Sequence, residues 1–306
     1  MEPPRQALRP QPVTIRRTLA LAAALLVLAG CAQRGAATPT PATSAPPAAA
    51  LPEGDTTLVL RVEYVGGFVP AEWTYSRLPS YSLYADGRQI TDGPVPAIHP
   101  GPALPNVQVQ QLEDAAVQAL LDQAVAAGVA DTTDLGSPPV ADAPSTRFTL
   151  TTADGTAVRE VYALSEYAME GDGSEAGLTD GQAAGRARLR ELLAALADVG
   201  QQGIPAGQVE PYVPAAVAAV ATPWADPADE LTHPELPWPG PELPGERLGG
   251  PLGVGCVVAT GEDATAVLTA AAQANAATPW VSGDARWRVL LRPLLPDESG
   301  CADLGG

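Results

Sequence analysis

A short apolar segment near the N-terminus predicts the compartment in which this chain folds. Residues 18–29 are almost entirely apolar, and they follow a polar, basic stretch that ends in Arg16-Arg17. A helix over this segment would be about 18 Å long at ~1.5 Å per residue, well short of the ~30 Å hydrocarbon core of a bilayer. That length is typical of the apolar region of a signal peptide, so we expect the rest of the chain to fold outside the cytoplasm.

The apolar segment runs into Leu28-Ala29-Gly30-Cys31, in which small residues precede a cysteine. This tetrapeptide resembles the lipobox of bacterial lipoproteins. The resemblance implies that residues 1–30 are removed and that Cys31 carries a diacylglycerol. Two acyl chains hold a protein stably at a membrane. We therefore expect lipid anchoring on the extracytoplasmic face of the cell membrane. A plain secretory signal with a fortuitous cysteine is the alternative.

The cysteine count fits an exported protein once the lipidated cysteine is set aside. The chain has three cysteines, which is an odd number for an oxidising compartment. With Cys31 lipidated, Cys256 and Cys301 remain, and they are expected to form a disulfide. A bridge of that span would contribute about 4 kcal/mol in the chain-entropy model. Two unpaired thiols are the alternative.

The chain is strongly acidic, with a formal net charge of −18 and no lysine. Removal of residues 1–30 leaves 13 arginines and 34 acidic residues, so the mature chain carries −21. Such a chain is repelled by nucleic acid, and no nucleic-acid partner is expected. The densest basic cluster is Arg186, Arg188 and Arg190, which we interpret as a solvated helix face.

Composition divides the mature chain into four parts. Residues 31–55 hold the lipidated cysteine and a tether rich in Ala, Pro and Thr, which cannot bury enough surface to order itself. An α+β domain is predicted over residues 56–222. A Pro- and Gly-rich connection spans 223–251, and a small βαβ lobe spans 252–306.

Periodicity and turn signals predict the elements of these parts. Asp-Gly pairs at 86–87 and 154–155 each lie between two strand-like segments and predict hairpins. The predicted strands are 57–65, 81–84, 88–91, 147–152, 157–164, part of 208–221, 253–259 and 286–293. The predicted helices are 114–127, 180–199 and one capped by Thr260 and Asp263. The fold class is therefore α+β, with a mostly antiparallel sheet, hairpins, two to three helices and a C-terminal βαβ lobe stapled by the disulfide.

Three further segments carry a resemblance. They are Gly66-Gly67-Phe68-Val69-Pro70, residues 78–90 (LPSYSLYADGRQI) and residues 292–298 (RPLLPDE). They are similar to segments of uncharacterised lipoproteins and secreted proteins of actinobacteria. The resemblance implies a shared α+β domain and supplies no catalytic residue.

Metal ligands are scarce in the sequence. The only histidines, His99 and His233, both precede proline, and the Glu230–His233 spacing gathers ligands only on a helix, which the flanking prolines oppose. We interpret both as solvated loop residues. The acidic segment 170–180 does not match an EF-hand loop, although a looser Ca²⁺ site stays open. No metal or cofactor is expected.

Aromatic residues form two groups in the sequence. Trp73, Tyr75, Tyr81 and Tyr84 make the first group, and core packing is favoured over ligand binding for them. The second group is Trp224, Trp238 and Trp280, which we expect to pack against the C-terminal lobe.

No catalytic motif is recognisable. The chain lacks G-x-S-x-G, and neither histidine lies near a strained serine turn. We expect a non-catalytic binding or scaffolding module whose partner is an envelope protein or a glycan. One alternative is an envelope hydrolase that uses paired carboxylates. The other is a protease-inhibitor-like module, for which 292–298 is the segment that would form an exposed rigid loop.

Overall fold

The computed structural model describes residues 49–165, 177–197, 206–249 and 253–305. The fold is α+β with mostly antiparallel sheets, and the predicted fold class is confirmed. Cys31 and most of the acidic segment 170–180 lie outside the described residues. Residues 47–306 form one compact unit.

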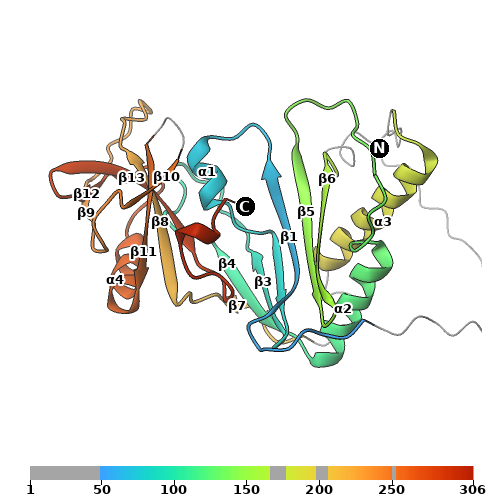
Figure 1. Cartoon of the computed structure of the whole chain (residues 1–306). Helices are drawn as coiled ribbons and strands as arrows, with labels where there is room; N and C mark the ends of the chain where they lie inside the picture. Colours follow the sequence, from blue (N-terminus) through green and yellow to red (C-terminus); the bar gives the residue numbers. More distant parts are fainter. Residues whose placement is uncertain (1–48, 166–176, 198–205, 250–252, 306) are drawn as a thin grey trace, which may run out of the picture. The chain divides into compact units, whose positions relative to one another are not determined.

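The first sheet has seven strands, and every pair of neighbours in it is antiparallel (Figure 1). In sheet order they are β6 (Gly155–Tyr162), β5 (Pro144–Thr152), β1 (Leu58–Gly66), β2 (Tyr81–Tyr84), β3 (Arg88–Asp92), β4 (Val107–Gln111) and β7 (Glu210–Pro211). Both predicted hairpins form, since Asp86-Gly87 joins β2 to β3 and Thr152 pairs with Gly155 across the second turn.

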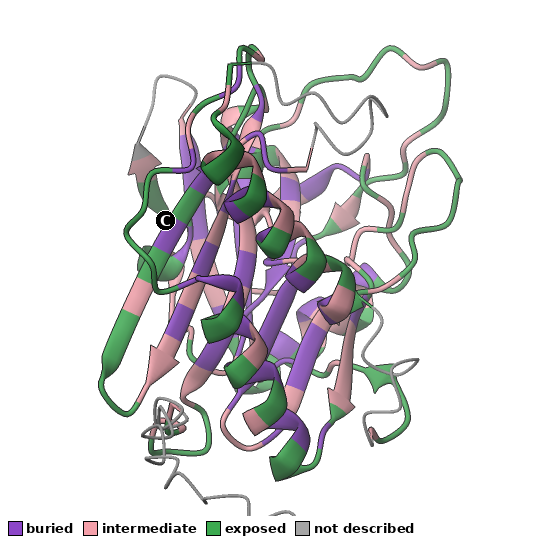
Figure 2. Cartoon of the chain, turned by 90° about the vertical axis from the view of Figure 1, so that its right-hand side faces the viewer, coloured by how far each residue is buried: buried purple, intermediate pink, exposed green. Residues whose placement is uncertain are grey.

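Helices α2 (Asp114–Ala127) and α3 (Asp180–Ala197) cover one face of this sheet, as Figure 2 shows. Their apolar residues join those of the strands in one core, in which Leu120, Leu121 and Phe148 are fully buried. The outward faces of both helices are exposed. This arrangement explains the helical period of the sequence, because only one stripe of each helix meets the sheet.

The ends of these helices follow local signals. Leu112 and Val117 flank the start of α2 and are both buried, as a hydrophobic staple requires. Gly128 ends that helix in the left-handed conformation, with φ of 87°. At α3, the amide of Gln182 donates to Thr179 Oγ1 and the amide of Thr179 donates to Gln182 Oε1, so the predicted capping box is present.

The second sheet has six strands. In sheet order they are β10 (Glu246–Gly249), β11 (Val254–Thr260), β8 (Ala216–Pro223), β13 (Ala285–Pro293), β12 (Trp280–Ser282) and β9 (Leu236–Pro237). Strands β11 and β13 both pair antiparallel with β8, so they run parallel to each other on either side of it. Helix α4 (Gly261–Ala271) lies in the connection between them and packs on this sheet, which completes the βαβ unit. Strand β8 comes before most of the Pro- and Gly-rich connection, and β11 to β13 come after it. The second sheet therefore contains strands from both sides of that connection.

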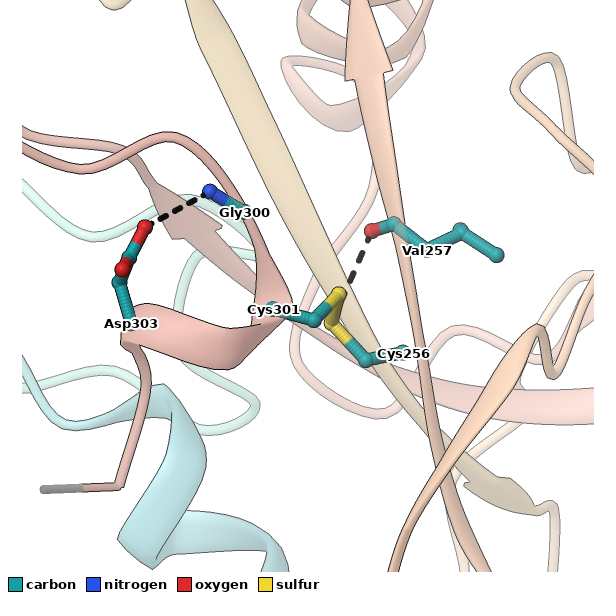
Figure 3. The surroundings of a disulfide bond; sticks show 5 residues. All are labelled: Cys256, Val257, Gly300, Cys301 and Asp303. Carbon is teal, nitrogen blue, oxygen red and sulfur yellow. Dashed lines mark hydrogen bonds between the residues drawn. A yellow bond between two sulfur atoms is a disulfide. The ribbon is translucent and has the colours of Figure 1, made fainter.

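The chain beyond β13 folds back and is joined to β11 by the predicted disulfide. Cys256 of β11 bonds Cys301 of the short 3₁₀ helix η2 (Cys301–Asp303), with 6.1 Å between their Cα atoms (Figure 3). The carboxylate of Asp303 accepts hydrogen bonds from the amides of Ser299 and Gly300, which stabilises this last turn.

Several local features differ from expectation. A short helix, α1 (Ala71–Ser76), forms where only aromatic spacing was noted. Thr260 precedes α4 but makes no side-chain capping hydrogen bond. Strands β4 and β10, which follow Pro-rich or Gly-rich sequence, were not predicted, and neither were the two- and three-residue strands β9 and β12. Arg186 is fully buried rather than solvated, because its Nη2 donates to the carbonyls of Tyr162 and Ala163 at 2.9 and 2.8 Å.

Candidate functional site

A cavity of about 540 Å³ lies on the helix-covered face of the first sheet, at the end of α3. We call it the sheet hollow. Its floor consists of polar side chains on neighbouring strands: Gln89, Thr91, Gln108 and Gln110. Pocket volumes of about 300–1,000 Å³ are usual for small-molecule sites, so the sheet hollow has the size of a ligand site.

Strand register brings the floor residues together. Gln89 of β3 lies directly opposite Gln110 of β4, and Thr91 lies opposite Gln108. Alternate residues of a strand share a face, so all four side chains rise from the same side of the sheet. The sequence signal for this face is the alternation of Val and Gln in β4, which a strand prediction there would have detected.

Several hydrogen-bonding groups of the floor have no protein partner within the described part of the chain. Gln89 Oε1 accepts a hydrogen bond from the Tyr81 hydroxyl at 3.4 Å, and Gln110 Nε2 donates to the carbonyl of Gly207 at 2.8 Å. The amide nitrogen of Gln89, the hydroxyl of Thr91 and the whole carboxamide of Gln108 make no hydrogen bond to any described residue. Donors and acceptors thus remain free for a ligand.

Burial keeps Tyr81, which also lines the sheet hollow, in its protonated form. The side chain of Tyr81 is 4% exposed, and this desolvation raises the pKa of its phenol well above the usual range. The hydroxyl therefore stays protonated and donates to Gln89, which turns the free amide nitrogen of Gln89 toward other acceptors. Of the described residues that line the sheet hollow, Asp92 alone is charged.

A second cluster joins both histidines to one carboxylate. Nε2 of His99 lies 3.2 Å from Asp229 Oδ2, and Nε2 of His233 lies 2.9 Å from Asp229 Oδ1. The hydrogen bond from His233, followed by those from the Leu231 amide and His99, lowers the pKa of Asp229 to about 2 against the opposing effect of desolvation. The expectation of solvated histidines is wrong for His233, whose side chain is 5% exposed. Among residues with described positions, no three of His, Cys, Asp or Glu are placed to hold a metal ion.

Three carboxylates line a smaller cavity beside β1, and each is engaged by hydrogen-bond donors. A cavity of about 240 Å³ beside β1 is lined by Glu63, Glu298 and Asp303. Arg147 pairs with Glu63 at 3.4 Å, and Arg292 pairs with Glu298 at 2.7 Å. Asp303 is held by the amides of its own turn, and those bonds lower its pKa. Each of these three carboxylates therefore already has a hydrogen-bond donor within the protein.

The first four residues of the segment 292–298 are buried in the protein. Leu294 and Leu295 are 2% and 3% exposed. Asp297 accepts hydrogen bonds from the Tyr84 hydroxyl at 2.7 Å and from Arg61 at 2.8 Å. The segment is therefore not the exposed rigid loop that a protease inhibitor requires.

The aromatic residues divide by location. Tyr81 and Tyr84 are buried as expected, and Trp238 and Trp280 pack edge to face at 5.4 Å in the second sheet. Trp73 is 48% exposed, so core packing is wrong for it. This exposure follows from α1, which buries Glu72 rather than its neighbour.

Of the predicted site residues, Cys256 and Cys301 are joined, and Cys31 lies outside the described part. The described residues contain no helix long and apolar enough to cross a membrane. No protein-family model, curated protein or solved structure matches this chain.

Proposed function

We propose that this chain is a lipid-anchored, extracytoplasmic binding protein that holds an uncharged ligand in the sheet hollow without transforming it. The observation that carries the proposal is the floor of the sheet hollow. Gln89, Thr91 and Gln108 present hydrogen-bonding groups that no described residue occupies, in a cavity of about 540 Å³. Ligand sites typically combine apolar walls with a few polar groups that fix orientation.

The anchoring part of the proposal rests on the N-terminal segment. Residues 18–29 are apolar and end at a tetrapeptide that resembles a lipobox, with Cys31 at its last position. Residues 32–48 lie between that cysteine and the first described residue, so they would form the tether between the lipid and the binding domain.

The absence of a catalytic role is favoured by the acids beside β1. A glycoside hydrolase needs one carboxylic acid that gives a proton and one carboxylate that stays free. Glu63 and Glu298 instead pair with arginines. This arrangement supports binding over the alternative of a hydrolase that uses paired carboxylates.

Anchoring is tested by Cys31→Ser. Without its thiol the chain cannot accept a diacylglycerol, so we expect a soluble product or an unprocessed precursor in fractionated cells. Intact-mass analysis of the wild-type protein should show a lipid on Cys31. Unchanged membrane retention of a mature Cys31→Ser chain would refute the anchoring.

Ligand binding is tested by photo-crosslinking in intact cells. A photo-reactive phenylalanine analogue is introduced at Val209, which lines the sheet hollow and is 54% exposed. The same analogue at Val158, which is 61% exposed on the edge strand β6, is the matched control. We expect a low-mass adduct at position 209 and none at 158. The same yield at both positions would refute a site in the sheet hollow.

A further inference from the structure

We propose that the ligand of the sheet hollow is an N-acetylated saccharide, recognised through its acetamido groups. This inference rests on the proposed binding function and names the chemical class of its ligand. The carrying observation is the presence of three glutamine carboxamides, Gln89, Gln108 and Gln110, on one face of two paired strands.

A carboxamide offers both a donor and an acceptor, as an acetamido group does. Gln89 contributes a free amide nitrogen, because its oxygen already accepts from Tyr81. Gln110 contributes a free oxygen, because its nitrogen already donates to Gly207. Since these two residues are direct cross-strand neighbours, one acetamido group could accept from the first and donate to the second.

The spacing of the floor suits a ligand with repeated polar groups. Neighbouring strands lie about 4.8 Å apart, and alternate residues of one strand are about 6.8 Å apart. Gln108 therefore lies one such step along β4 from Gln110, opposite Thr91. Its carboxamide has no partner among the described residues, so it can meet a second sugar unit.

The apolar wall of the sheet hollow can contact the methyl group of an acetamido group. Leu193 and Leu196 of α3 and Val209 form an apolar side above the polar floor. A ligand that carries an amide next to a methyl group satisfies both surfaces at once. A sugar with hydroxyls alone offers no methyl group to this apolar side.

A peptide fits the sheet hollow less well, although it also carries amides. Peptides that bind sheets add as a strand at a free edge. The floor lies on β3 and β4, and β3 is paired on both sides by β2 and β4. Recognition at the floor must therefore run through side chains.

The charge of the sheet hollow also favours an uncharged saccharide. Asp92 is the charged residue among the described ones that line it, and the glutamines and Thr91 are neutral. An anionic ligand would meet no compensating positive charge there, so an uncharged saccharide is the better complement.

The test is calorimetric titration of the detergent-solubilised full chain with tri-N-acetylchitotriose. Cellotriose is the matched control ligand, because it has the same linkage and lacks the acetamido groups. We expect tri-N-acetylchitotriose, called chitotriose below, to bind at least tenfold more tightly than cellotriose. Equal affinities would overturn the acetamido inference and would leave the binding function standing.

Two variants locate the binding. Gln108→Leu and Thr91→Val remove hydrogen-bonding groups with little change of volume, and each should weaken chitotriose binding about 2- to 12-fold. Gln273→Leu, on an exposed part of the chain after α4, should leave it unchanged. Binding that neither floor variant weakens would place the sugar elsewhere and overturn the proposal.

The two proposals can fail separately. If chitotriose does not bind while the analogue at Val209 still captures a low-mass adduct, the saccharide inference is wrong and the binding function stands. If neither is observed, both are wrong. Shortened sugar products in the calorimeter cell would instead support the hydrolase.

Discussion

Glu298→Gln is expected to destabilise the protein far more than a surface charge change would. Glu298 and Arg292 are 5% and 3% exposed at the point where the chain folds back after β13. Their two contacts measure 2.9 and 2.7 Å, and Glu298 Oε2 also accepts from the Leu295 amide at 2.7 Å. Glutamine keeps the shape of glutamate but removes the charge that compensates the buried guanidinium.

The magnitude follows from burial. Breaking a buried ion pair by neutralising one partner typically costs about 3–5 kcal/mol, because the other charge stays buried. The substituted carboxamide would still offer one acceptor, so we expect the lower end, about 3 kcal/mol. The pair of Arg286 and Glu235 is the control, since its side chains are 56% and 45% exposed. For Glu235→Gln we expect a loss of at most about 1 kcal/mol.

The assay is urea denaturation of the full chain followed by tryptophan fluorescence, with free energies of unfolding compared at equal slope. The double variant Arg292→Met, Glu298→Leu should recover part of the loss, because it removes both buried charges together. The reasoning is refuted if Glu298→Gln loses no more stability than Glu235→Gln.

Three further predictions concern other parts of the fold. Cys301→Ser should lower the free energy of unfolding by about 4 kcal/mol in the chain-entropy model, since the bridge to Cys256 spans 45 positions; reductant should lower the wild-type melting temperature and leave the variant unchanged. The pKa of Asp229 is about 2 in the folded protein, against about 3.9 when unfolded, so its carboxylate stabilises the fold above pH ~4 and this contribution is lost as the pH falls toward 2. The Asp229→Asn variant should therefore have a lower melting temperature than the wild type at neutral pH, and this difference should disappear in acid. A difference in melting temperature that stays constant across pH would contradict the linkage. Leu121→Ala removes a fully buried side chain of the helix-covered core and should cost about 2–5 kcal/mol by chemical denaturation; a loss under about 1 kcal/mol would mean that the site is not packed as described.

Two segments that are far apart in the sequence meet in space. Tyr84, from residues 78–90, donates to Asp297, from residues 292–298. Arg61 adds a charged hydrogen bond to the same carboxylate. These contacts connect the first sheet to the chain beyond the second.

The sequence alone predicted the elements that depend on near neighbours. The helix over 114–127 has the predicted bounds, because its apolar period and Gly128 are local signals. The Asp-Gly hairpins and the capping box at Thr179 are local in the same way. The disulfide was predictable by elimination, once Cys31 was assigned to the lipid.

Only the tertiary structure decided which distant residues meet. His99 and Asp229 are 130 positions apart, and no local pattern indicates that they share a hydrogen bond. Arg186 looked solvated by helical position, yet it is buried, and its Nη2 donates to the carbonyls of Tyr162 and Ala163 at the end of β6. The floor of the sheet hollow likewise depends on the register of β3 against β4. Periodicity specifies which face of an element is apolar, whereas packing and register between elements decide which polar groups find partners and which are left for a ligand.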